Sequence, residues 1–341
     1  MTKPDPQGVD RGSNHAAATS TPLKAGIVGS GIAGASCAGH LATAGWEVDV
    51  FEKARGAGGR LSTRRLEQGW ASLGTPFLSA QRDPFRSQLR QWVRQGWLEA
   101  VRGDVLQGRA TVSWVQAQLQ NHYRLNIEPS KLVHALLGEA RLHTNAPVAA
   151  LKARTIILED GREMGNFDCV ICSVPTPQAL PLLDALPLLR DGLGGVRYRP
   201  VWSFLMRWEG GPTADVIKFD DHLLKLAVRQ SSGNPGLWVV HSSHEFAETY
   251  LDASVEEAST RAASALMGLL GLPWPVEVEV SHLWRYARPE TTPAGGFWLS
   301  DRESRVALIG DGIAGAGVER AWESGVRLAQ ALIQAKAELV L

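Results

Sequence analysis

Residues 24–65 read KAGIVGSGIAGASCAGHLATAGWEVDVFEKARGAGGRLSTRR, and this stretch decides the fold. An apolar strand pattern at 25–28 enters the glycine turn at 29–34, and a helix of small residues then leads to an alternating strand that ends at Glu52. This order predicts a βαβ unit with a dinucleotide fingerprint. The glycines permit a tight turn and close approach of a pyrophosphate to the helix N-terminus, and Glu52 would accept hydrogen bonds from a ribose.

A second glycine motif follows the acid. Five residues separate Glu52 from Gly58-Gly59-Arg60, and this arrangement resembles the signature of the FAD-binding amine-oxidase and desaturase superfamily. In that superfamily the GGR segment runs beside the flavin, and simple NAD dehydrogenases do not carry it. The alternative interpretation is a flexible, basic glycine loop.

The C-terminal region supports the same interpretation. Residues 306–309 form an apolar strand pattern, the sequence GDGIAGAG occupies 310–317, and a helix is predicted over 318–337. Too few residues follow Gly315 for a second βαβ unit, so we expect a late flavin motif of the same superfamily. The resemblance implies that Asp311 meets the ribityl or pyrophosphate region. The amides near Gly317, Val318 and Glu319 would then point at the flavin ring, where a helix N-terminus favours negative charge.

Composition limits the other possibilities. The chain has 341 residues, 44% of them hydrophobic, and a formal net charge of zero. These values predict about two domains and favour neither a nucleic-acid face nor a membrane surface. Residues 1–22 are polar and lack an apolar core, so they indicate a disordered tail rather than a signal peptide, and we expect a cytoplasmic protein.

Two of the three cysteines form a C-x-x-C pair, Cys169 and Cys172, inside an apolar strand pattern. Residues three apart on a strand face opposite sides, so the two sulfurs should not meet. No second pair completes a metal site, and we expect buried thiols and no metal. No cysteine follows Cys172, which argues against a thioether-linked flavin and for FAD held non-covalently.

The remaining sequence predicts a second, strand-rich domain. Strands are expected at 201–208, 223–229, 237–242 and 276–285, and an amphipathic helix over 254–270 should stop at Gly271. A helix over 82–101 should bury Phe85, Leu89, Trp92 and Val93 on one face. The predicted fold class is α/β, with a discontinuous Rossmann-like FAD-binding domain (23–66, 123–178 and 301–341) and a smaller mixed-sheet substrate domain (67–122 and 179–300).

Five phrases, at 53–64, 172–178, 238–241, 283–289 and 310–325, resemble those of bacterial renalases, which are small FAD-dependent oxidoreductases. This resemblance implies oxidation of isomeric dihydronicotinamide nucleotides, with hydride transfer to flavin N5 and reoxidation by oxygen. Trp284 and Phe77 would then flank the substrate ring, and His241 would hold its carboxamide or the flavin edge. Plain core packing remains the alternative for His241 and Trp284.

The chain departs from the renalase pattern beside the expected flavin. Renalases typically carry Gly-Ala-Gln-Tyr-Phe where this chain has Gly74-Thr-Pro-Phe-Leu78. Ser72 replaces an aspartate, and an expected asparagine falls near Arg229 or Gln230. These positions would touch the substrate, so the departures bear on the substrate more than on the cofactor.

The superfamily resemblance also implies an adenine contact from the backbone of Val148. The expected cofactor residues are Gly29, Gly31, Ile32, Ala33, Gly34, Glu52, Lys53, Gly59, Arg60, Val148, Asp311, Gly317 and Val318.

Three other functions stay open. An amine oxidase usually presents a lysine near flavin N5, but residues 194–207 contain none. Carotenoid-type desaturases share the motifs in generally longer chains. The third alternative is a protein that binds FAD without turning over a substrate. A small-molecule substrate, oxygen and a monomer or homodimer are the expected partners and state.

Overall fold

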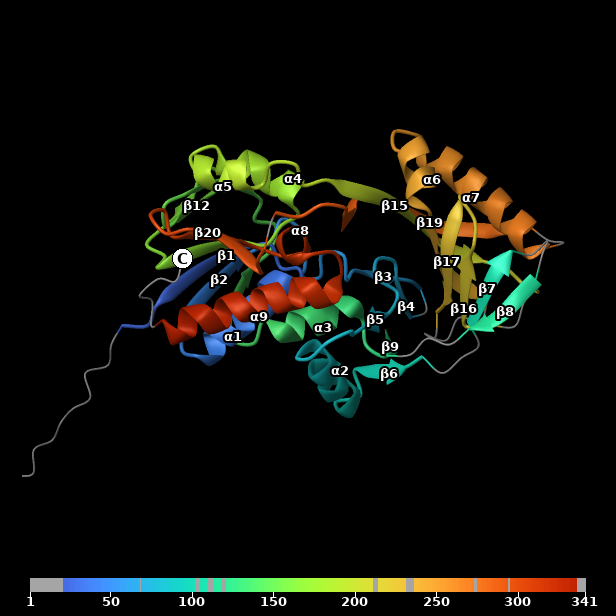
Figure 1. Ribbon diagram of the computed structural model, residues 1–341, viewed down its shortest axis with the longest axis horizontal. Coiled ribbons are helices and arrows are strands. Elements are labelled where there is room, and N and C mark those ends of the chain that lie inside the picture. The colour runs from blue at the N-terminus through green and yellow to red at the C-terminus, as the bar shows by residue number, and fades with distance from the viewer. Residues whose placement is uncertain are drawn as a thin grey trace, which may run out of the picture.

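The structure is a computed structural model, and it describes residues 21–67, 69–101, 105–109, 113–117, 121–210, 214–230, 236–272, 275–293 and 295–335. The expectation of a disordered tail therefore lies outside the described residues over 1–20. Two large sheets lie side by side along the long axis of the molecule, and β15 runs from one half into the other (Figure 1).

The first sheet has six strands in the order β10-β2-β1-β14-β21-β20. Five are parallel: β10 (Arg141–His143), β2 (Glu47–Phe51), β1 (Lys24–Val28), β14 (Cys169–Cys172) and β21 (Val306–Ile309), and β20 (Trp298–Asp301) is antiparallel at the edge. The register pairs Val28 with Cys172 and Cys172 with Leu308. The glycine turns after β1 and β21 therefore leave the same edge of the sheet, which is where ligands bind in such folds. The predicted α/β class is confirmed.

Helices cover both faces of this sheet. One face packs on α1 (Ile32–Thr43), α9 (Val318–Gln334) and α3 (Pro129–Leu136), and Figure 1 shows α9 running across α1. The helices approach closely at glycines, because a Cβ on Gly325 would overlap the carbonyl oxygen of Ala33. The other face is covered by α4 (Thr176–Ala179), the 3₁₀ helix η1 (Leu180–Leu183) and α5 (Pro187–Gly192), beside the small sheet of β11 (Val148–Lys152), β12 (Thr155–Leu158) and β13 (Glu163–Met164).

The cysteines follow the predicted alternation. All three are free and buried. Cys169 packs into the cluster under α1 and α9, whereas Cys172 packs into the cluster on the opposite face. Burial raises the pKa of Cys169 to about 12 and that of Cys172 to about 11, so both remain protonated thiols. No group of residues that could hold a metal ion occurs in the described part of the chain.

The second large sheet has seven strands, in the order β19-β15-β18-β17-β16-β7-β8. Their bounds are β19 (Glu277–Pro289), β15 (Tyr198–Arg207), β18 (Leu237–Ser242), β17 (Leu224–Arg229), β16 (Val216–Phe219), β7 (Val105–Arg109) and β8 (Ser113–Ala117). β19 is one of the two edge strands, and its register with β15 shifts at two points. One face of the sheet packs on α7 (Val255–Leu270). This helix begins and ends as predicted, since the Oγ of Ser254 accepts from the Glu257 amide and Gly271 ends the helix at φ +61°.

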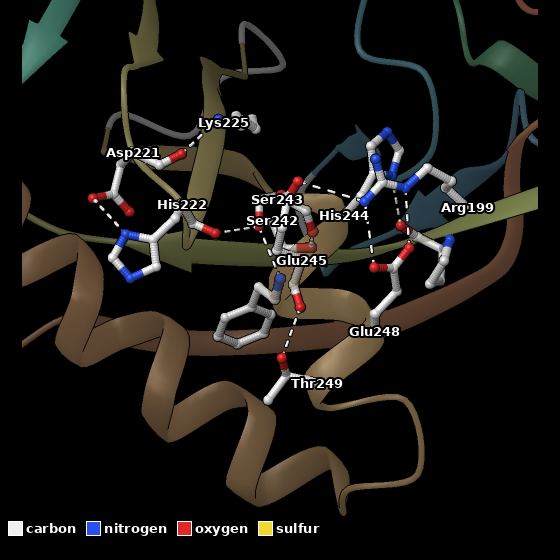
Figure 2. Close-up of polar contacts among 12 residues, drawn as sticks. Arg199, Asp221, His222, Lys225, Ser242, Ser243, His244, Glu245, Glu248 and Thr249 are labelled. Atoms are coloured by element: carbon white, nitrogen blue, oxygen red, sulfur yellow. Dashed lines mark hydrogen bonds and ion pairs between the residues drawn. The ribbon is translucent and has the colours of Figure 1, made fainter. Parts of the chain in front are cut away.

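A polar cluster attaches α6 (His244–Thr249) to the beginning of β15. Figure 2 shows Arg199 beside Glu245 and Glu248, and the Nε of Arg199 lies 3.0 Å from Oε1 of Glu248. The hydroxyl of Ser243 caps the helix by accepting a hydrogen bond from the Phe246 amide. Nδ1 of His244 lies 2.9 Å from the carbonyl oxygen of Pro200. These contacts are structural and partly exposed.

Short elements join the two halves. β3 (Thr63–Arg65) pairs with β4 (Trp70–Ser72), and β9 (His122–Leu125) lies between β5 (Leu78–Ser79) and β6 (Leu98–Ala100). The predicted helix over 82–101 is shorter, α2 (Phe85–Arg94). The expectation that Val93 is buried was wrong: it is 37% exposed, because Phe85, Leu89 and Trp92 already form the buried stripe and Val93 lies on its flank.

Packing suggests different domain boundaries from those in the sequence analysis. Residues 180–193 pack on the first sheet, α2 joins the cluster under α9, and β20 pairs with β21. All three segments were expected in the substrate domain. We propose boundaries near residues 197 and 297 in place of 179 and 300. None of the helices among the described residues is long and apolar enough to cross a membrane.

Candidate cofactor and substrate site

The first glycine turn is shaped by close backbone contacts. Gly29 has φ +92°, a conformation that side-chain-bearing residues rarely adopt. A Cβ on Gly34 would overlap the carbonyl oxygen of Gly29, whereas a Cβ on Gly31 would meet no atom within 4 Å. Gly31 is the N-cap of α1 and offers no side-chain cap, so the first amides of the helix face open space. Ile32 and Ala33 are buried at this helix start.

Glu52 lies at the end of β2, as expected for a ribose acceptor, and is 8% exposed. Its Oε2 accepts from the amide and the hydroxyl of Ser30, at 3.0 and 2.8 Å, and its Oε1 accepts from the Ala54 amide at 2.9 Å. The carboxylate is therefore held in one orientation by the glycine turn itself. Lys53, next in sequence, is exposed.

The GGR segment lies against the first turn. The Gly58 amide donates to the Ser30 carbonyl oxygen at 3.0 Å, and a Cβ on Gly59 would lie 3.3 Å from the Cα of Gly31. Two glycine motifs that are separate in the sequence thus form one surface.

The C-terminal glycine motif, residues 310–317, completes that surface. The Gly310 amide donates to Oγ of Ser324 at 2.8 Å, and Asp311 opens the short helix α8 (Asp311–Ala314). Gly317, at φ +112°, caps α9 just before Val318, and a Cβ there would meet no atom within 4 Å. The carboxylate of Glu319 instead accepts hydrogen bonds from the amides of Gln81 and Arg82.

Arg60 and Asp311 contact each other directly. Nη1 and Nη2 of Arg60 donate to the two carboxylate oxygens at 2.7 and 2.6 Å, and the hydroxyl of Tyr198 donates to Asp311 at 3.4 Å. Burial acts to lower the pKa of Arg60, but the charge and hydrogen bonds of Asp311 raise it, so the guanidinium stays charged. For the phenol of Tyr198, burial raises the pKa, so its hydroxyl stays protonated.

The second face of the seven-stranded sheet lies over these turns. Its strand register places His282, Ser203 and His241 in one row, and the hydroxyl of Ser203 donates to the Leu73 carbonyl oxygen. The Trp284 ring contacts the His282 ring, with centroids 4.2 Å apart, and its Cζ2 would lie 3.4 Å from a Cβ on Gly74.

Two polar atoms of this face have no hydrogen-bond partner among the described residues: Nε2 of His241 and Nε1 of Trp284. Both are buried. Burial lowers the pKa of His241 to about 4, although the backbone of Leu73 and Gly74 acts weakly in the opposite direction, so this imidazole is neutral near pH 7. An unpaired buried donor is costly, which indicates a ligand group that completes it.

Hydrogen bonds of Ser72 stabilise the segment at 74–78. The side-chain carbonyl of Gln230 accepts from the Ser72 amide at 3.0 Å, and the hydroxyl of Ser72 donates to the Thr75 carbonyl oxygen at 2.6 Å. Phe77 packs against the buried cluster of Val105, Val216 and Val228 and meets the His122 ring edge-on at 5.0 Å. Val228 of that cluster pairs with Val239, two residues before His241 on β18, so Phe77 lies on the same face of the sheet as His241.

Val148 lies at the start of β11, partly buried against the cluster that contains Phe51. The structure describes no ligand there, so an adenine contact remains a prediction. Sequence reasoning missed Ser173 and Tyr198. The hydroxyl of Ser173 donates to the carbonyl oxygens of Val28 and Gly29, and its place directly after β14 could have indicated this. Tyr198 carried no local signal.

The residues present suit a bound dinucleotide. Gly31 and Gly317 leave open space at two helix N-termini without side-chain caps, Glu52 is oriented by the first glycine turn, and Gly59 lies against Gly31. Helix N-termini bind pyrophosphate and stabilise negative charge on a reduced ring. His241 and Trp284 both lie close to Gly74.

Comparisons with known proteins agree with this geometry. The family described as flavin containing amine oxidoreductase matches residues 76–333, and the NAD(P)-binding Rossmann-like domain matches residues 27–92. L-amino-acid oxidase BmooLAAO-I of Bothrops moojeni is 41% identical over 81 residues, which is 23% of this chain and 16% of that enzyme. The chain thus aligns with a small part of this relative's length.

Solved structures share the fold at low identity. Putrescine oxidase bound to putrescine superposes with a TM-score of 0.66 at 14% identity, covering 92% of this chain and 100% of that one. A fatty acid isomerase from P. acnes that produces CLA gives 0.70 at 12% identity, covering 90% and 98%. These likenesses show the fold.

Proposed function

Because the chain belongs to the flavin-containing amine oxidoreductase family, we propose that it binds FAD non-covalently and oxidises a small organic donor with oxygen as the final acceptor. Membership of the family makes the protein a flavin-dependent oxidoreductase. When bound, FAD supplies a two-electron acceptor that oxygen can reoxidise to give hydrogen peroxide. Gly31, Gly59 and Gly317 would present backbone to the cofactor, and Glu52 would accept from its ribose.

One observation carries the choice of substrate class: His241 and Trp284, both partly buried, each hold a buried polar atom that has no hydrogen-bond partner among the described residues. An indole N–H only donates, and a neutral imidazole can donate or accept. This pair suits the carbonyl or amide of an uncharged ring better than a carboxylate. The leading candidates are therefore the isomeric dihydronicotinamide nucleotides, whose electron-rich ring needs little acid or base assistance.

The role of the chain is then to orient the donor and to enclose it. Trp284 and Phe77 would lie on either side of the donor ring, and His241 would bind its polar group. His241 stays neutral because burial disfavours its charged form, so it can hold a hydrogen bond without delivering a proton. Exclusion of water by these side chains protects the reduced cofactor from side reactions.

Amine oxidation is the second candidate, and the family match favours it. Family members that oxidise amines usually place a lysine near the flavin, and residues 194–207 contain none. The row His282, Ser203 and His241 offers neutral groups instead. A neutral amine could still bind there, so the two candidates have to be separated by experiment.

The test is anaerobic stopped-flow absorbance of the purified holoprotein with normal NAD(P)H, its 2- and 6-dihydro isomers, putrescine and L-amino acids. We expect fast flavin bleaching by the isomers alone. Trp284→Phe and His241→Gln should slow it by about tenfold or more while FAD stays bound. Trp46→Phe is the matched control, since Trp46 precedes β2 at the opposite edge of the sheet.

Bleaching by amines alone would move the assignment to amine oxidation. A protein with full FAD content that no donor bleaches would overturn the enzymatic proposal for this panel and favour a binding role. Equal rates in the wild type and in both site variants would show that the unpaired atoms of His241 and Trp284 do not meet the substrate.

A further inference from the structure

Arg60 contacts three other segments of the chain. Its guanidinium binds Asp311 through two hydrogen bonds, and Nη1 also donates to the carbonyl oxygens of Ala287 and Tyr286, at 2.9 and 3.3 Å. Asp311 follows β21 of the first sheet, whereas Tyr286 and Ala287 belong to β19 of the second. One side chain therefore joins the two sheets.

The backbone of Arg60 contacts the third segment. Its carbonyl oxygen accepts from the Thr75 amide at 3.1 Å, and a Cβ on Gly74 would overlap that same oxygen. Trp284 lies directly beyond Gly74. The position of Arg60 is thus transmitted to the altered segment at 74–78 and to the indole of Trp284.

β15 and β19 form the ribbon that connects the two halves, and it is held at both sides. They pair from Tyr198–Pro289 to Arg207–Glu277. Tyr198 donates to Asp311 and meets the Tyr286 ring edge-on at 6.0 Å, and the next residue, Arg199, binds Glu248 of α6 on the outside (Figure 2). The inner attachment is buried around Asp311, which is 5% exposed.

We propose that Arg60 is a positioning residue that clamps the β15–β19 ribbon to the Asp311 turn and so sets the distance between the glycine turns and the Trp284–His241 face. Nη1 and Nη2 of its guanidinium already bind Asp311 and the two β19 carbonyl oxygens, and this assigns Arg60 a role in positioning these segments. Arg is needed because its planar fork can serve a carboxylate and carbonyl oxygens at once, which an ammonium group cannot do.

The test is amide hydrogen exchange of the protein stripped of flavin, compared among wild type, Arg60→Met, Arg60→Lys and Arg64→Met. Arg64 is an exposed arginine of the same segment and serves as the matched control. In Arg60→Met we expect exchange of peptides covering 198–201 and 284–289 to rise by about tenfold or more, with β1 and β14 unchanged. Arg60→Lys should give a smaller rise, and Arg64→Met none.

Unchanged exchange of the ribbon in Arg60→Met would overturn the clamp, whatever happens to FAD affinity. If Arg60→Met does not fold, Arg60→Lys and Asp311→Asn decide: both must loosen the ribbon, and protection equal to wild type in either one contradicts the proposal. The readout uses protein without cofactor, so it does not depend on which substrate the holoprotein oxidises.

Discussion

The two walls of the site differ in what lines them: backbone lines the cofactor wall, and side chains line the opposite wall. The cofactor wall consists of glycine turns in which backbone meets backbone: a Cβ on Gly34 would overlap Gly29, and Gly59 lies against Gly31. The opposite wall is a sheet face with side chains, and it leaves the polar atoms of His241 and Trp284 unpaired. The first wall is fixed by steric limits and fits one class of ligand. The second can change its ligand by changing a few side chains.

The steric limit of the cofactor wall should give the largest effect. In Gly34→Ala the new methyl group overlaps the Gly29 carbonyl, and overpacking against backbone should lower the free energy of unfolding by about 3 kcal/mol or more. FAD content after purification should fall with it. The measurement is urea unfolding followed by circular dichroism.

Gly31→Ala is the control for that substitution. Its φ of −71° suits alanine, and its Cβ meets no atom within 4 Å. We expect the flavin-free protein to keep its stability within about 0.5 kcal/mol. A loss of stability equal to that of Gly34→Ala would contradict the steric account of the turn.

Titration of the opposite wall should give the next effect. The pKa of His241 is lowered from 6.5 to about 4 by burial. Between these values the unfolded chain takes up a proton that the folded chain refuses, so stability should fall as the pH drops from 6.5 to 4, by about 2–3 kcal/mol from this group. His241→Gln should reduce the dependence of stability on pH between 6.5 and 4.

Urea unfolding at pH 7, 5.5 and 4.5 measures this, with His134→Gln on α3 as the control for loss of one histidine. His282 has its pKa lowered by burial as well and acts in the same direction. A wild-type curve and a His241→Gln curve with the same slope would show that His241 is not kept neutral by burial.

The cofactor wall can also be altered without disturbing its packing. Gly31→Val places a branched side chain in the open space over the start of α1. We expect FAD affinity to fall by about tenfold or more, which corresponds to about 1.4 kcal/mol. Fluorescence titration of the flavin-free protein measures this Kd. An unchanged Kd would mean that the cofactor does not approach Gly31.

The smallest effect is expected outside both walls. Arg199 of β15 and Glu248 of α6 form a partly exposed ion pair. Such pairs contribute about 0.2–1 kcal/mol, so Arg199→Ala should lower stability by less than about 1 kcal/mol and leave flavin reduction unchanged. A change in the reduction rate would mean that α6 communicates with the site.

The same contrast explains what could be predicted from the sequence. The βαβ unit, β18 and α7 followed from local periodicity, caps and glycines, because such signals lie within a few residues of one another. The pairing of Arg60 with Asp311 joins residues 251 apart in the sequence, and no local pattern encodes it. Likewise, the row of His282, Ser203 and His241 depends on strand register, and the exposure of Val93 depends on which neighbours complete the stripe of α2.

The edge position of β19 has a consequence for how molecules meet in concentrated solution. A long edge strand offers its backbone as a template on which another chain could add a strand and begin aggregation. Here the register of β19 with β15 shifts twice, and exposed charges recur along the strand, at Glu277, Glu279, Arg285 and Arg288. Interrupted register and charged side chains both oppose strand addition, so any self-association should use a surface other than this edge.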